Sequence, residues 1–248
     1  MERTAVLGRL TWQPAEVVEI RRETSQTKTI AFDVAGWPGH RAGQHVDIRL
    51  TGEDGYQAER SYSIASAAAG SRVELTVLRI DDGEVSPYLT DQLGPGDAIE
   101  LRGPIGGHFV WDPTVQGKVF LAAGGSGVVP LMAMARQRAL EHNAIPTRLL
   151  YSARTWDDVI YRDELARLAE SGDGFDAVYT LTHAQPPGWT GYHRRIDRAL
   201  LDEVAPADLA LAFVCGPTPF VEAVANALVE LGHEPMRIKT ERFGPTGG

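Results

Sequence analysis

The segment Arg60-Ser61-Tyr62-Ser63 places an arginine, an aromatic ring and two serines on consecutive residues. Arginine offers a fixed charge and a forked donor for phosphate, tyrosine a flat ring with a polar tip, and serine a short donor and acceptor. Strand alternation puts Arg60 and Tyr62 on one face and Ser63 on the other, so all three could meet one bent ligand only where the strand twists or ends. A flavin dinucleotide suits this set of residues, although an exposed edge strand would carry the same residue types.

A glycine-rich turn, Gly125-x-Gly127-x-x-Pro130, follows an apolar run at residues 119–123. Such a turn lets the backbone approach a pyrophosphate and points free N–H groups and the dipole of the next helix at it. Proline replaces the third glycine of the usual dinucleotide fingerprint and suits a first helical turn. A tight turn without a ligand is the alternative. A serine nucleophile at Ser126 is excluded, because Val128 stands where a nucleophile elbow needs glycine.

Two shorter segments complete the candidate chemistry. Gly83, Val85 and Ser86 lie where a strand pattern changes into a helix pattern, which makes a second possible anion site or an ordinary serine cap. Cys215-Gly216-Pro217 follows directly after an apolar run. Ligands of open parallel sheets bind beyond the carboxyl ends of the strands, so we expect Cys215 at the binding edge; a small buried apolar residue is the alternative.

The strands and helices that must position these residues fall into two halves, which differ in the spacing of their hydrophobic residues. Short runs rich in Val, Ile and Thr predict strands at 16–23, 28–34, 43–50, 60–66, 72–80 and 97–103, with a helix at 86–93. This pattern predicts a six-stranded antiparallel β-barrel. After a polar connection at 112–116, strands at 119–123, 148–154, 177–182, 209–215 and 236–241 alternate with helices near 128–139, 161–170, 197–204 and 220–231. That alternation predicts a parallel sheet, followed by a loop at 242–248.

Composition excludes several classes of function. The net charge of −9 and a pI near 5.3 argue against a nucleic-acid partner, since such proteins concentrate positive charge. Cys215 is the one cysteine, so these 248 residues can form no internal disulfide and no cysteine-ligated iron–sulfur cluster. The seven histidines show no ligand spacing, so no metal site is predicted. Glycines and a proline interrupt the most apolar stretch, 119–134, so we expect no membrane insertion and a cytoplasmic protein.

In this order, the four motifs resemble the ferredoxin–NADP reductase superfamily, and the resemblance covers nearly the whole chain. It implies an FAD-binding β-barrel over residues 1–113 and a Rossmann-like NAD(P)-binding α/β domain over residues 114–248. In the barrel it implies that Arg60 holds the FAD pyrophosphate, that Tyr62 stacks on the isoalloxazine, and that Ser63 lies near its N5. The neighbouring Ser61 would also be a cofactor-binding residue. The segment that contains Gly83, Val85 and Ser86 would bind the pyrophosphate from the helix side.

In the α/β domain the resemblance implies that Gly125, Gly127 and Pro130 cradle the nicotinamide dinucleotide. Cys215, followed by Gly216 and Pro217, would lie beside the reacting nicotinamide carbon. Glu241 and Phe243 resemble a C-terminal acid and an aromatic ring that cover the flavin. Ser63, Cys215 and Glu241 are therefore the expected catalytic residues.

The choice between NADPH and NADH depends on a cation for the 2′-phosphate. The resemblance implies that Ser152 and Arg154 bind this phosphate and that Tyr161 stacks on the adenine, which favours NADPH. Thr182-His183 departs from the pattern, since many relatives have arginine at the second position. Histidine is only partly charged at neutral pH, although a bound phosphate would raise its pKa.

The implied activity is hydride transfer from NAD(P)H to FAD, followed by transfer of single electrons. Because the chain has one cysteine, we expect a stand-alone reductase that serves a separate iron–sulfur carrier of the ferredoxin type or an oxygenase component. Two alternatives remain. One is a reductase of free flavins or quinones, and the other is a non-catalytic regulatory module that binds nucleotides.

Overall fold

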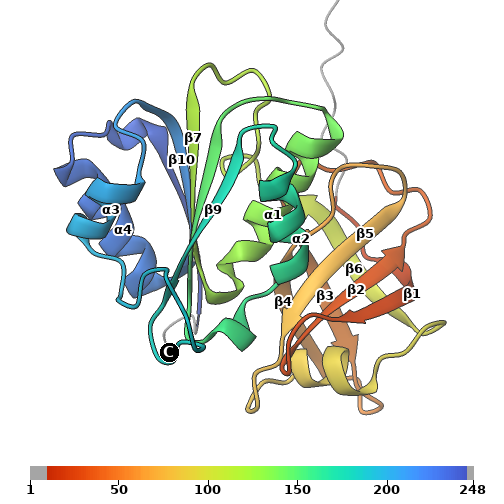
Figure 1. Ribbon diagram of the computed structural model, residues 1–248. Coiled ribbons are helices and arrows are strands. Elements are labelled where there is room, and N and C mark those ends of the chain that lie inside the picture. Colours follow the sequence, from red (N-terminus) through yellow and green to blue (C-terminus); the bar gives the residue numbers. More distant parts are fainter. Residues whose placement is uncertain (1–9, 245–248) are drawn as a thin grey trace, which may run out of the picture.

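The computed structural model describes residues 10–244, which form two sheets side by side (Figure 1). The first is a six-stranded antiparallel sheet with strand order β4-β3-β6-β1-β2-β5. Its strands are β1 (Gln13–Arg22), β2 (Thr27–Asp33), β3 (His45–Thr51), β4 (Gln57–Ser63), β5 (Arg72–Leu78) and β6 (Ala98–Ile105). An isolated bridge between Ile64 and Leu75 joins the two outer strands. The predicted antiparallel barrel is confirmed.

The second sheet has five parallel strands in the order β11-β10-β7-β8-β9. They are β7 (Lys118–Gly124), β8 (Thr147–Ala153), β9 (Phe175–Leu181), β10 (Leu209–Pro217) and β11 (Ile238–Phe243). The helices are α1 (Val128–Leu140), α2 (Arg162–Glu170), α3 (Arg198–Val204) and α4 (Thr218–Glu230). This is the predicted alternation of strands and helices, and the Rossmann-like fold class is confirmed.

Helices cover both faces of the parallel sheet. In Figure 1, α1 and α2 lie on the face toward the barrel, and α3 and α4 lie on the other face. The central strand β7 is therefore buried from Val119 to Gly124, which explains its continuous apolar sequence. Among residues 10–244, none of these helices is long and apolar enough to span a membrane.

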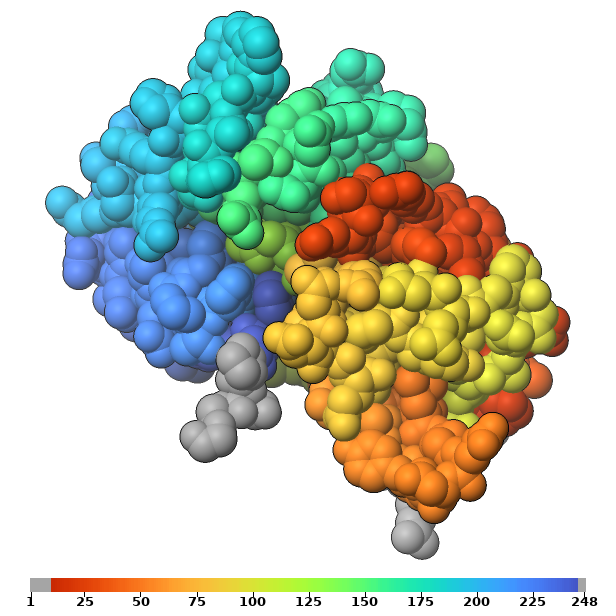
Figure 2. Space-filling model, turned by 90° about the horizontal axis from the view of Figure 1, so that it is seen from below, coloured from red at the N-terminus to blue at the C-terminus, as the bar shows by residue number. Residues whose placement is uncertain are grey.

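Strand β5 shows how the barrel meets the α/β domain. Val73, Leu75 and Val77 alternate along it and belong to the barrel core. The intervening Glu74 and Thr76 point the other way and are also buried. A strand buried on both faces must be covered from outside the barrel. Figure 2 shows the barrel strands, red to yellow, in contact with the green and blue segments of the α/β domain.

A network of charges fills this interface. Arg136 on α1 donates to the backbone oxygen of Ala65 at 2.8 Å and pairs with Glu74 at 3.2 Å. The same guanidinium pairs with Glu164 of α2 at 2.7 Å. Nearby, the hydroxyl of Tyr161 donates to Thr76. These contacts fix the barrel against the helices that cover the parallel sheet.

Candidate functional site

The residues of the β4 motif have different surroundings. Arg60 is exposed, whereas Tyr62 is half-buried against the barrel core, and burial raises the pKa of its hydroxyl to about 12. Ser61 donates to the Asp47 carboxylate at 2.6 Å, so its hydroxyl already has a partner. Ser63 is half-buried at the end of the strand. The strand therefore presents an exposed guanidinium, a ring and a hydroxyl in sequence.

The turn after β5 is anchored to the protein rather than open. Ser86 is 6% exposed, and its Oγ accepts a hydrogen bond from the Ile80 amide at 3.1 Å. Val85 belongs to the barrel core, and the amide of Gly83 donates to the carbonyl of Ile80. The helix that follows is a single π-helical turn, Tyr88–Gln92. Any contact of Val85 with a ligand would thus come from its backbone, whereas Ser86 could use its backbone amide or the proton of its hydroxyl.

The glycine turn after β7 combines open space with close packing. Gly125 has φ +55°, and an added Cβ would meet nothing within 4 Å. At Gly127, by contrast, a Cβ would lie 2.1 Å from the backbone oxygen of Cys215. Pro130 is buried in the first turn of α1. Gly125 therefore borders accessible space, whereas Gly127 lets α1 approach β10.

Strand ends from the two halves of the chain meet at one place through a side-chain contact between His45 and Glu241. In the parallel sheet, Cys215 of β10 is in register with Glu241 of β11. Oε1 of Glu241 lies 4.0 Å from Nδ1 of His45, which is the first residue of β3 in the barrel. His45 in turn pairs across the antiparallel ladder with Ser63. The structure thus connects three predicted catalytic residues, Ser63, Cys215 and Glu241, through His45.

The electrostatics of this meeting point are unusual for a protein surface. Burial raises the pKa of Glu241 to about 7, and its Oε2 has no hydrogen-bond partner among residues 10–244. Burial, with a further contribution from Glu241, raises the pKa of the Cys215 thiol. Burial also lowers the pKa of His45, against an opposing effect of Asp47. Near neutral pH, Glu241 can therefore hold or release a proton, and Cys215 stays a thiol.

The residues proposed for the 2′-phosphate and adenine are not all brought together. Ser152 is half-buried at the end of β8, and Arg154 just beyond it is exposed. His183 is also exposed, and its amide donates to the Arg154 carbonyl at 2.8 Å. Tyr161, however, is 3% exposed and lies in the interface with the barrel. A ring so enclosed offers no face to an adenine.

The C-terminal segment continues the sheet further than the sequence pattern predicts. The loop expected at 242–248 begins later, because β11 extends to Phe243, whose ladder partner is Pro217. Phe243 is 37% exposed. Gly216 packs tightly, since a Cβ there would lie 2.7 Å from the Phe220 ring. Residues 245–248 lie outside the described residues.

Sequence reasoning missed His45 and Glu84. His45 looks like an ordinary strand residue, and only the pairing of β3 with β4 places it beside Ser63. Glu84 lies inside the Gly83 to Ser86 segment, but its carboxylate turns to Arg60, with 3.2 Å between Oε2 and Nη2. An acid between two predicted phosphate-binding residues was the signal that could have identified it.

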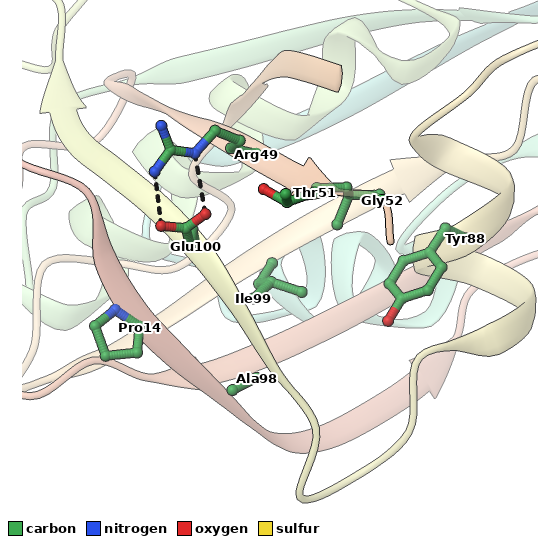
Figure 3. A pocket seen from close by; sticks show the side chains of 9 residues that line it. Pro14, Arg49, Thr51, Gly52, Tyr88, Ala98, Ile99 and Glu100 are labelled. Carbon is green, nitrogen blue, oxygen red and sulfur yellow. Dashed lines mark hydrogen bonds and ion pairs between the residues drawn. The ribbon is translucent and has the colours of Figure 1, made fainter. Parts of the chain in front are cut away.

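A cavity of about 420 Å³ lies elsewhere on the barrel (Figure 3). It is bordered by the ends of β1, β3 and β6 and by Tyr88, and Arg49 and Glu100 are joined above it by hydrogen bonds of 3.0 and 2.7 Å. His45 is at the opposite end of β3. This cavity is therefore separate from the place where the two domains bring the catalytic candidates together. No cluster of metal-ligating side chains occurs within the part of the chain that the structure describes.

The residues at the domain boundary fit a flavin dinucleotide. Tyr62 supplies a half-buried ring and Arg60 a cation for phosphate. Glu241 supplies a buried oxygen that has no hydrogen-bond partner among the described residues. Gly125 leaves space for a second nucleotide at the carboxyl end of β7.

Comparisons with known proteins agree with this arrangement. The family model described as oxidoreductase FAD-binding domain matches residues 14–111, and the one described as oxidoreductase NAD-binding domain matches residues 121–226. Ferredoxin–NADP reductase B of Sorangium cellulosum is 34% identical over 238 residues, which cover 92% of this chain and 96% of that protein. The cytochrome P450 reductase GcoB of Amycolatopsis superimposes with a TM-score of 0.83 at 29% identity, over 98% of this chain and 74% of that one.

The glycine betaine monooxygenase reductase subunit of Pseudomonas aeruginosa is 32% identical over 235 residues, which cover 92% of this chain. The match covers 63% of that relative, so the chain spans just under two thirds of its length. The two family models and the near full-length similarity to Ferredoxin–NADP reductase B agree with the geometry of the site. The chain therefore belongs to the ferredoxin–NADP reductase superfamily of oxidoreductases, with an FAD-binding and a nicotinamide-nucleotide-binding domain.

Proposed function

We propose that this chain is a cytoplasmic FAD-dependent reductase that takes a hydride from NADPH and delivers single electrons to an iron–sulfur carrier or an oxygenase component. One observation carries the proposal: the contact of 4.0 Å between His45 and Glu241 joins the end of β4 to the carboxyl ends of β10 and β11. A flavin held by the barrel and a nicotinamide held by the sheet would meet there. Residues 1–113 would bind FAD and residues 114–248 the nicotinamide nucleotide.

Each residue would have a limited task at this place. Tyr62 would stack on the flavin ring, Ser63 would donate to its N5, and Arg60 would bind its pyrophosphate. When bound, FAD would supply the conversion of a hydride into two single electrons. Cys215 would lie beside the nicotinamide, and Glu241 and Phe243 would cover the flavin, with Phe243 moving aside when the nicotinamide docks. The burial of Cys215 supports exclusion of water from the contact.

Arg154 supports NADPH as the reductant. Its side chain is exposed just beyond β8, and it makes no ion pair with any acid of residues 10–244. The backbone contact between His183 and Arg154 brings His183 to the same edge. A 2′-phosphate would find a charge-assisted donor here that NADH would leave unused.

The test of this preference is Arg154→Ala. We expect kcat/KM for NADPH to fall roughly 10- to 100-fold, because a hydrogen bond to a charged group is lost, while the value for NADH changes less than about twofold. Arg148→Ala is the matched control, since Arg148 is half-buried at the other end of the same strand and pairs with Asp176. Equal losses for both nucleotides would contradict the assignment of Arg154 to the phosphate.

The names of two similar proteins support this choice of acceptor. One is named as the reductase subunit of glycine betaine monooxygenase, and the other as a cytochrome P450 reductase. Anaerobic titration with NADPH should bleach the flavin band, and a purified ferredoxin or oxygenase component should then restore it. Reoxidation by free FMN or quinone at rates that no protein acceptor exceeds would favour the free-flavin alternative. A flavin that is bound but not bleached would contradict the enzyme proposal.

A further inference from the structure

Glu84 engages the arginine that the proposed function assigns to the FAD pyrophosphate. Nη2 of Arg60 donates to Oε2 of Glu84 at 3.2 Å, and the Tyr56 hydroxyl donates to Oε1 at 2.8 Å. Nη1 of Arg60 donates to the carbonyl of Glu59 at 2.7 Å. Both terminal nitrogens of the guanidinium and both oxygens of the carboxylate therefore have a partner.

The position of Glu84 is imposed by its neighbours. Val85 is 1% exposed in the barrel core, and Ser86 is held by the Ile80 amide. These anchors leave the Glu84 side chain directed outward, toward β4. Tyr56 comes from the turn between β3 and β4, which is closed by a 2.8 Å hydrogen bond from the Gly52 amide to the Tyr56 carbonyl. Three separate segments thus converge on one exposed ion pair.

A carboxylate and a phosphate compete for the same donors. An arginine fork binds both anions through its N–H groups with similar geometry. A phosphate oxygen at Nη2 of Arg60 would need the position that Oε2 of Glu84 holds, and side by side the two anions would repel each other. The Arg60 and Glu84 side chains are 55% and 49% exposed, so their pair is weak enough to be exchanged for a ligand.

We propose that Glu84 is an internal competitor for the FAD pyrophosphate at Arg60, and that its displacement sets the affinity of the chain for FAD. This inference rests on the proposed function, in which FAD is the ligand of the barrel. Tyr56 takes part in this competition, because its hydrogen bond holds the Glu84 carboxylate near Arg60. In the FAD complex, Glu84 turns away from Arg60 and Tyr56 loses this acceptor.

The experiment measures the dissociation constant of FAD by quenching of its fluorescence, after removal of bound flavin from the full chain. Glu84→Gln should bind FAD roughly 3- to 10-fold more tightly, because the competing charge is gone. Tyr56→Phe should bind about twofold more tightly, because the carboxylate is held less firmly. Arg60→Gln should bind at least about tenfold more weakly.

Glu59→Gln is the matched control, since this exposed neighbour loses the same charge without touching the Arg60 side chain through its own carboxylate. Its affinity should stay within about twofold of the parent. Unchanged or weaker binding by Glu84→Gln would overturn the inference, since the acid would then have no effect or would orient Arg60 for the phosphate. A parent chain that binds no FAD would instead contradict the proposed function.

Discussion

At the scale of single residues, Glu241 is the group whose chemistry departs most from that of an exposed carboxylate. Its burial raises the pKa from 4.5 to about 7, and one of its oxygens has no partner in the described part of the chain. The groups that face it are His45 across the domain boundary and Cys215 on the neighbouring strand. Neither carries a positive charge near neutral pH that would hold Glu241 ionised, because burial lowers the pKa of His45.

This shift predicts a pH dependence of stability. Between pH 4.5 and 7 the folded chain keeps the Glu241 proton while the unfolded chain has lost it, so the free energy of unfolding falls as pH rises through that window. Glu241→Gln removes this loss without changing the shape of the side chain. At pH 8, with flavin removed, the variant should be about 1–3 kcal/mol more stable than the parent, and at pH 4.5 about equal.

Urea unfolding between pH 4.5 and 8 measures this difference. Glu230→Gln, on the exposed end of α4, should leave the pH profile of the parent unchanged. Parallel profiles for the parent and Glu241→Gln would show that Glu241 titrates as an ordinary carboxylate.

At the scale of elements, the close contact of α1 with β10 depends on Gly127. The 3₁₀ turn Gly125–Gly127 leads directly into α1, and a Cβ on Gly127 would overlap the Cys215 backbone. Backbone cannot give way as a flexible side chain can. The second glycine of the motif is therefore required by the fold itself, whether or not a nucleotide is bound.

Gly127→Ala should lower the free energy of unfolding by about 2–3 kcal/mol or prevent folding, because an overpacked contact with backbone has no room to relax. Gly107→Ala is the control, since its Cβ would meet nothing within 4 Å, and it should change stability by less than about 0.5 kcal/mol. Thermal unfolding of the flavin-free chains tests both. A Gly127→Ala chain as stable as the parent would assign this glycine to ligand binding alone.

At the scale of the whole molecule, Arg136 connects the barrel to the α/β domain. Its side chain is 13% exposed and reaches Glu74 and the Ala65 carbonyl on the barrel side as well as Glu164 on α2. The barrel has a core of its own, whereas the apolar cluster around α1 also includes Ala42 and Ala65 from the barrel half. Polar and apolar contacts therefore join the two halves. The distance between His45 and Glu241 depends on the same interface.

Arg136→Met should lower the free energy of unfolding by about 2–4 kcal/mol, because it leaves Glu164 without its buried partner. Glu74 would keep Arg21 and Arg72, which favours the lower end of this range. Arg148→Met breaks an exposed pair and should change stability by less than about 1 kcal/mol. Scanning calorimetry provides the measurement, and similar transition temperatures for the two variants would contradict a structural role of Arg136 between the domains.

The fold could be predicted from the sequence because each half has a distinct hydrophobic period. The chemistry that depends on contacts between distant segments could not. Tyr161 follows the second strand of the parallel sheet, where the resemblance implies a ring that stacks on adenine. Its hydroxyl instead donates a hydrogen bond to Thr76 of the barrel. The sequence pattern did not identify His45 and Glu84, because their partners, Glu241 and Arg60, come from other strands. The local hydrophobic pattern indicates which residues belong to one strand. Strand register and domain packing determine which charged side chains come into contact.

The single bridge between Ile64 and Leu75 determines where the barrel can open locally. Within residues 10–244, β4 has a full ladder only with β3, so its other edge over residues 57–62 pairs with no described strand. Local opening along this edge would break few hydrogen bonds and would leave the rest of the barrel intact. Amide hydrogens there should exchange with solvent before those of β2, which has a ladder on each side.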